Sequence, residues 1–201
     1  MDTLGNTIDL MKSISILNTG RYTWSYDESN DKIRYAKWRP TTKNQYDSLR
    51  SKTYENSLIK EKIGSKFNYM NLVDINGVTY SADQLKNKVL VINYWFVGCG
   101  PCEVEMPELN KLVEKYKTND DVVFISFARS SKSKITKFLD KNQFSYPVVV
   151  MTDDFAKEFK ISAYPTNYVI DKGGTFHHAS RGIGIAAVDI LADKIKTALV
   201  K

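Results

Sequence analysis

Short apolar runs and longer mixed segments alternate along most of this chain. The runs Val89–Tyr94 and Val122–Phe127 are almost continuously apolar, as in strands buried on both faces of a parallel sheet. A strand–helix–strand unit comes first, and a strand pair around Lys172–Gly174 followed by a helix comes last. This order predicts an α/β protein with a central mixed β-sheet flanked by helices.

The other elements of this region follow from the same periodicities. Apolar residues at helical spacing predict a helix, and short apolar runs bounded by turn residues predict a strand. The expected helices cover 99–117, 131–142, 154–160 and 186–200, and the expected further strands cover 148–151, 166–170 and 175–179.

The first 62 residues have a different pattern. Aromatic and polar residues alternate over 22–26, which indicates a half-buried strand, and 33–38 predicts a second strand that completes a hairpin. A helix is expected from Thr41 or Thr42 to about Lys62. We therefore divide the chain into an extension, 1–62, that packs on a main domain, 63–201.

Composition excludes several classes of protein. Hydrophobic residues make up 42% and charged residues 26%, as in an ordinary globular protein. The net charge of +6 comes from scattered basic residues, so no nucleic-acid partner is expected. No apolar run approaches the ~18 residues of a membrane helix. The first twenty residues do not read as a leader, which leaves a cytoplasmic protein or an envelope protein whose leader or anchor is absent from this chain.

Both cysteines of the chain lie in one tetrapeptide, Cys99-Gly100-Pro101-Cys102. Two cysteines exclude a disulfide-rich scaffold, a four-thiolate zinc site and an iron–sulfur cluster. The pair falls where a buried strand ends and a helix begins. At that position backbone N–H groups and the helix dipole lower the pKa of the Cys99 thiol, while Cys102 lies deeper. The tetrapeptide can therefore exchange disulfides.

Two plainer interpretations of the cysteines remain open. They could be inert core residues, or half of a zinc site completed by His177 and His178. Adjacent residues of a strand point to opposite faces, so both histidines cannot easily reach one metal ion, and no metal site is predicted. We expect the two histidines to be exposed strand residues.

Residues 93–107, Asn-Tyr-Trp-Phe-Val-Gly-Cys-Gly-Pro-Cys-Glu-Val-Glu-Met-Pro, resemble the active-site strand and helix of thioredoxins, and more closely the TlpA/ResA-like branch. The likeness begins at 63–67, continues through 74–77 and 83–86, and covers about 63–201. It implies a thioredoxin-like fold with an added strand and helix around 131–147. It does not cover 1–62.

The resemblance assigns roles by position. Cys99 matches the nucleophile and Cys102 the resolving thiol, joined as a disulfide in the oxidised state without any other cofactor. Pro107 matches the proline that kinks the active-site helix. The residues that the resemblance places at the substrate are those of the cis-proline loop and of the cysteine segment: Tyr164, Pro165, Thr166, Gly100, Pro101 and Trp95.

The chain departs from thioredoxins at two positions beside the cysteine pair. Asn93 replaces the buried aspartate that relays protons, and Gly98 replaces a tryptophan, which opens the site. In the resembling branch a glutamate three residues after the second cysteine is the usual proton carrier, and Glu105 has that place. We expect Glu105 to be partly buried, to have a raised pKa and to exchange protons with Cys102. The alternative is a solvent-facing helix carboxylate.

The resemblance implies a monomeric thiol–disulfide oxidoreductase that reduces protein disulfides in the cell envelope, in a pathway such as cytochrome c maturation. An upstream membrane or thioredoxin-type donor would supply its electrons. One alternative is a peroxiredoxin-like peroxidase, although Phe96 stands where such enzymes keep a threonine. Another is a partner-binding module that uses the aromatic residues of 22–26.

Overall fold

The computed structural model describes residues 22–27, 35–159, 161–182 and 187–201. The chain divides near residue 57 into two compact units, which are described separately. In the first unit, β1 (Tyr22–Asp27) and β2 (Tyr35–Pro40) form an antiparallel hairpin in which Trp24 pairs with Trp38. The predicted hairpin is therefore present. The packing of this unit on the main domain stays a prediction.

Helix α2 (Lys43–Ser57) follows the hairpin. Thr42 and Gln45 cap it reciprocally, because each backbone N–H donates to the other's side chain, at 2.9 and 3.2 Å. The helix ends five residues earlier than expected. Beyond it, Ile59 donates a backbone hydrogen bond to the Ala179 carbonyl at 2.9 Å and its side chain is buried in the main core. Tertiary contacts therefore override the helical pattern here.

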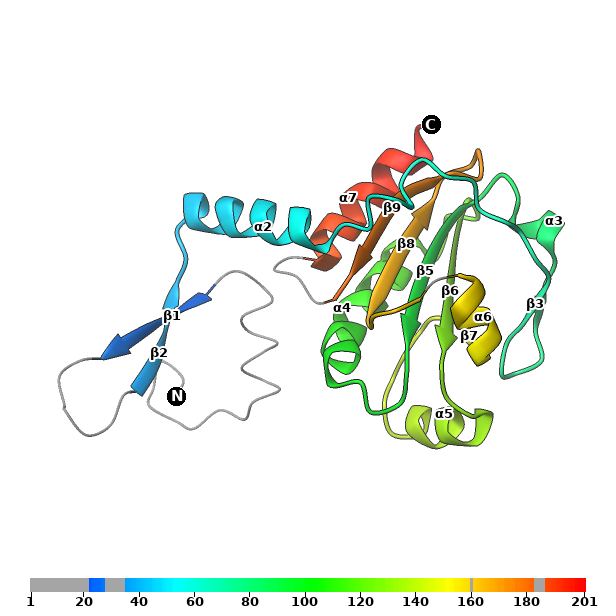
Figure 1. Cartoon of the computed structure of the whole chain (residues 1–201), viewed down its shortest axis with the longest axis horizontal. Helices are drawn as coiled ribbons and strands as arrows, with labels where there is room; N and C mark the ends of the chain where they lie inside the picture. Colours follow the sequence, from blue (N-terminus) through cyan, green and yellow to red (C-terminus); the bar gives the residue numbers. More distant parts are fainter. Residues whose placement is uncertain (1–21, 28–34, 160, 183–186) are drawn as a thin grey trace. The chain divides into compact units, whose positions relative to one another are not determined.

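The second unit is built on a five-stranded mixed sheet (Figure 1). Its strands lie in the order β7-β6-β5-β8-β9; β5, β6 and β7 are parallel, while β8 and β9 are antiparallel to their neighbours. This confirms the predicted mixed α/β sheet. The strands are β5 (Val89–Trp95), β6 (Val122–Ala128), β7 (Val148–Val150), β8 (Thr166–Ile170) and β9 (Phe176–Arg181).

Helices cover both faces of this sheet. Side chains of α4 and α7 share one core cluster with Val89 and Val91, whereas Leu90, Ile92 and Tyr94 belong to a second cluster on the opposite face, with residues of α6. Every residue of β5 is buried, as its apolar run predicts. The helices are α4 (Gly100–Tyr116), α5 (Lys132–Leu139), α6 (Asp153–Glu158) and α7 (Ala187–Leu199).

A small hairpin and a single helical turn precede β5, and the sequence did not predict them. They are β3 (Leu72–Val73), β4 (Thr79–Tyr80) and α3 (Ala82–Leu85). Asp74 holds the turn between the two strands, because its Oδ1 accepts hydrogen bonds from two backbone N–H groups of that turn. Strands of two residues are too short to show a period of two. Within the described ranges, no helix has the length and apolarity needed to cross a membrane.

Candidate active site

The cysteine pair lies at the start of α4, directly after the central strand. Cys99 is the N-cap residue, and its carbonyl accepts a hydrogen bond from the Glu103 N–H at 3.0 Å. The Cys102 N–H donates to Cys99 Sγ at 3.3 Å. Pro101, in the first turn, lacks an N–H where the helix needs none. An N–H directed at a sulfur favours the thiolate, so the backbone is arranged to stabilise a Cys99 thiolate once the disulfide is reduced.

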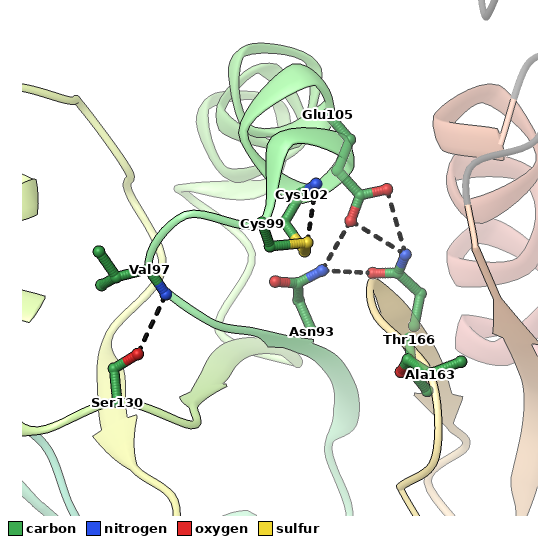
Figure 2. The surroundings of a disulfide bond; sticks show 9 residues. Asn93, Val97, Cys99, Cys102, Glu105, Ser130, Ala163 and Thr166 are labelled. Carbon is green, nitrogen blue, oxygen red and sulfur yellow. Dashed lines mark hydrogen bonds between the residues drawn. A yellow bond between two sulfur atoms is a disulfide. The ribbon is translucent and has the colours of Figure 1, made fainter.

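The two cysteines are joined by a disulfide, with their Cα atoms 5.3 Å apart (Figure 2). Cys99 is 4% exposed and Cys102 is 1% exposed. Cys99 is therefore the sulfur that a partner reaches first. On the side of α4 the disulfide is surrounded by apolar side chains, since both cysteines share a core cluster with Met106.

The loop between β5 and α4 is held by one hydrogen bond and contains a glycine with a positive φ. The Val97 N–H donates to Ser130 Oγ at 3.1 Å, as Figure 2 shows. Gly98 has a φ of +91°, which side-chain-bearing residues rarely adopt. A Cβ at Gly98 would meet no atom of the described residues within 4 Å. The glycine at this position therefore serves the backbone conformation in addition to leaving the site open.

The loop before β8 lies against the cysteine segment. The Tyr164–Pro165 peptide bond is cis. The Tyr164 ring packs edge-on against the Phe96 ring, with centroids 5.2 Å apart, which joins this loop to the segment that leads into Cys99. At the helix start, Gly100 is half-buried and Pro101 is exposed. Phe96 and Tyr164 pack against the core cluster that contains both cysteines.

Two side chains assigned to the substrate face inward instead. Trp95 has no exposed surface; its ring packs against Phe138 and Phe144, and its Nε1 donates to Ser126 Oγ at 3.3 Å. Trp95 therefore packs in the core beneath α5, and its contact with a substrate stays a prediction. Thr166 is 2% exposed, and its hydroxyl donates to the Ala163 carbonyl at 2.8 Å, which closes the cis-proline loop.

Glu105 lies one turn after Cys102 on α4, and its carboxylate points toward the central strand (Figure 2). Asn93 Nδ2 donates to Glu105 Oε1 at 2.8 Å and to Asn167 Oδ1 at 3.0 Å. Asn167 Nδ2 donates to Glu105 Oε1 at 3.3 Å and to Oε2 at 3.4 Å. One carboxyl group and two amides thus form a closed polar triad under the disulfide.

The triad is sealed from solvent. Glu105 is 5% exposed, which rules out the solvent-facing interpretation. Burial raises the pKa of Glu105 to about 7, because the cost of desolvation exceeds the stabilisation of the ionised form by Asn167 and Asn93. A group with this pKa can both accept and release a proton near neutral pH.

Asn167 was not among the residues that the sequence pointed to. It lies opposite Asn93 in the antiparallel pairing of β5 with β8. The available signal was a second asparagine, in a strand whose remaining residues from Tyr168 to Ile170 are apolar.

Pro107 lies inside α4, and the helix continues through it to Tyr116.

The histidine prediction was wrong for one residue. His178 is 2% exposed, and its Nε2 lies 3.0 Å from Ser180 Oγ. His177 is half-buried and its Nε2 lies 2.8 Å from Thr197 Oγ1. The reason is that α7 covers this face of β9. Among the described residues, no cluster of three or more histidine, cysteine or carboxylate side chains could hold a metal ion.

Comparison with known proteins assigns this chain to a family. The family described as AhpC/TSA matches residues 63–179, which is more than half of the chain. The chain belongs to the AhpC/TSA family. Among solved structures, the fold of this AhpC/TSA protein is similar to that of a thiol:disulfide interchange protein of the thioredoxin family from Chlorobium tepidum, with a TM-score of 0.59 and 21% identity over 68% of this chain and 97% of that one. The thioredoxin-like fold expected from the motif is thereby confirmed.

Two curated relatives have related names. The thioredoxin-like protein YneN of Bacillus subtilis is 27% identical over 124 residues, which cover 61% of this AhpC/TSA chain and 73% of that protein. The thiol-disulfide oxidoreductase ResA of Geobacillus kaustophilus is 28% identical over 104 residues, which cover 51% of this chain and 60% of ResA. This AhpC/TSA member is a thioredoxin-like oxidoreductase of the thiol–disulfide class.

Proposed function

We propose that this protein reduces disulfides of other proteins, with Cys99 as nucleophile, Cys102 as resolving thiol and Glu105 as the proton carrier. The observation that carries the proposal is the buried Glu105 carboxyl, one helical turn from Cys102 and with a pKa near neutral. A purely structural disulfide has no use for an ionisable group in this position, because burying it costs stability.

The reaction uses the disulfide and its reduced dithiol form in turn. The Cys99 thiolate attacks a substrate disulfide; a bond forms between Cys99 and one substrate sulfur, and the other substrate sulfur leaves as a thiolate that takes a proton from solvent. Cys102 then gives its proton to the Glu105 carboxylate. The Cys102 thiolate attacks Cys99 Sγ and forms the internal disulfide; the bond from Cys99 to the substrate breaks, and the second substrate sulfur leaves as a thiolate that takes a proton from solvent. Two electrons pass to the substrate, and a donor dithiol restores the Cys99–Cys102 pair.

The cell envelope is the proposed location. The supporting observation is that a structure with the same fold, at a TM-score of 0.56 and 20% identity over 65% of this chain, is described as an exposed lipoprotein thioredoxin, Etrx1, of Streptococcus pneumoniae. Disulfides persist as substrates in such oxidising compartments. There a membrane or thioredoxin-type donor would supply electrons, and a cytochrome c precursor is one candidate substrate.

Reduction of insulin by the chemically reduced protein tests this function. We expect precipitation of the insulin B chain by the natural protein and none by Cys99→Ser. Cys102→Ser should accumulate a mixed disulfide between Cys99 and the substrate, visible as a mass adduct that dithiothreitol removes. A reduced protein that leaves insulin intact, or that consumes peroxide much faster than it reduces insulin, would contradict the proposal.

The direction of the reaction is tested by equilibrium with glutathione. The Cys99–Cys102 pair of a reductant stays oxidised at glutathione ratios that reduce a strong oxidant. A pair that becomes fully reduced under mildly reducing ratios would make this protein an oxidant.

A further inference from the structure

We propose that Tyr146 is a positioning residue for Glu105: its buried hydroxyl is the reserve donor that hydrogen-bonds the Glu105 carboxylate, directly or through one water, when Glu105 is ionised. The inference rests on the proposed function only for the role of Glu105 as a proton carrier. The interaction itself is a property of the folded chain and is measurable without turnover.

The first observation is an unused donor in the core. Tyr146 is 2% exposed, and its hydroxyl forms no hydrogen bond with any residue that the structure describes. A buried hydroxyl without a partner is unfavourable, and such groups often mark a functional role. The ring is held firmly, because it packs against Phe144 and Phe124 with centroids 4.9 and 5.1 Å away.

The second observation is the place of Tyr146 relative to the triad. The next residue, Pro147, accepts hydrogen bonds through its carbonyl from both the N–H and the hydroxyl of Ser126, at 2.8 and 3.2 Å. Ser126 is paired with Asn93 across β5 and β6. Tyr146 also shares a core cluster with Leu109 of α4, which lies one turn after Glu105. Tyr146 thus packs against α4, the helix that carries Glu105, and lies next to the strand pair β5 and β6 that carries Asn93.

The third observation is unused capacity on the carboxylate. An ionised carboxylate can accept about four hydrogen bonds. Oε1 of Glu105 receives two, at 2.8 and 3.3 Å, whereas Oε2 receives only a long one from Asn167, at 3.4 Å. The ionised group therefore has room for a further donor at Oε2, and a phenol that stays protonated is such a donor.

The charges around the pair agree with this role. Burial first, and then the Glu105 charge, raise the pKa of Tyr146 well above its ordinary value, so the hydroxyl keeps its proton. The groups that face Glu105 from β5 and β8 are the uncharged amides of Asn93 and Asn167. On α4 itself, Cys102 is held in the disulfide and does not titrate. In the oxidised protein Tyr146 thus stays protonated and can donate to the ionised Glu105 carboxylate.

Tyr94 provides a matched control. It is fully buried, and its hydroxyl also lacks a hydrogen-bond partner among the described residues. It follows Asn93 in β5 and therefore points to the opposite face, where its ring packs on Phe127 and Tyr168. Replacing either tyrosine by phenylalanine removes one unpaired buried hydroxyl, but only the Tyr146 change removes a donor near Glu105.

The experiment is a pH titration of the Glu105 carboxyl by ¹³C NMR in the oxidised, glutamate-labelled protein, with Glu105→Gln to assign the signal. We expect Tyr146→Phe to raise the Glu105 pKa by roughly one unit, and Tyr94→Phe to leave it unchanged. An unchanged or lowered pKa in Tyr146→Phe, or equal shifts in both variants, would overturn the inference. Because the oxidised protein is titrated, a failure of disulfide reductase activity would leave this result intact.

Discussion

Asn93 and Asn167 face each other across β5 and β8, and both donate amide hydrogen bonds to the carboxyl group of Glu105. Asn93 also donates to Asn167, so each amide fixes the orientation of the other. Thioredoxins have a buried aspartate at the position of Asn93. Here the buried acid is Glu105, and two uncharged amides donate hydrogen bonds to its ionised form. This arrangement allows Glu105 to be ionised near neutral pH although its side chain is buried.

Replacing Asn167 by leucine should raise the pKa of Glu105. The ionised carboxylate would lose the two Asn167 contacts at 3.3 and 3.4 Å, while burial would remain. We expect the carboxyl titration to move upward from about 7 by roughly one unit. Asn110→Leu is the control, because Asn110 lies on the same helix but bonds the Gln143 carbonyl and the Ser145 N–H. An equal shift in both variants would show that the Asn167 amide is not responsible.

Replacing Glu105 by glutamine should stabilise the oxidised protein, and by more at high pH. Below the ordinary value of 4.5, Glu105 is protonated in both the folded and the unfolded chain, so its burial carries no ionisation cost. Between 4.5 and about 7 the unfolded chain ionises first, and stability falls as pH rises. Above pH 7 the full cost is present, on the order of 3 kcal/mol.

Urea unfolding of the oxidised protein at pH 5 and pH 8 measures this effect. The advantage of Glu105→Gln over the natural protein should be small at pH 5 and largest at pH 8. Glu108→Gln is the control, because Glu108 is exposed on the same helix and pairs with Lys111. An advantage of Glu105→Gln that does not change with pH would contradict the raised pKa.

Replacing Gly98 by alanine should destabilise the protein through its backbone. The φ of +91° at this position is unfavourable for any residue with a Cβ, while the space around it is open. We expect a loss of about 1–2 kcal/mol in the free energy of unfolding. Gly173→Ala is the control, since Gly173 is exposed and a Cβ there would make only an ordinary contact at 3.4 Å. Equal losses in the two variants would show that the left-handed conformation is not the cause.

The parts of the fold that could be predicted are those with local periodicity. The run from Val89 to Tyr94 identified the central strand because a strand buried on both faces has no polar interruptions except a functional one, Asn93. The cysteine pair and Glu105 could be placed together because Cys102 follows Cys99 by three residues and Glu105 follows Cys102 by three, and residues three apart are neighbours on a helix surface. These predictions needed no information from distant parts of the chain.

The parts that could not be predicted depend on contacts between distant segments. Asn167 reaches the site only through the register of β5 with β8, a pairing across 74 positions that no local pattern encodes. The end of α2 is decided by the hydrogen bond between Ile59 and Ala179, and the burial of His178 by the packing of α7 on β9. Trp95 was assigned to the substrate by its place in the motif, but α5 and the segment after it cover its ring.

Replacing Asn93 by aspartate would restore the thioredoxin-like acid, and here it should couple two carboxyl groups. The new oxygen would lie at the position of Nδ2, 2.8 Å from Glu105 Oε1, where two ionised groups repel strongly. The pair should hold one proton between them and titrate in two steps, one below and one above the single midpoint near 7 of the natural protein. Carboxyl ¹³C NMR of the oxidised protein resolves the two steps, with Asn110→Asp as the control on an unrelated segment of α4. A single titration with an unchanged midpoint would contradict the short Asn93–Glu105 contact on which this account of the site depends.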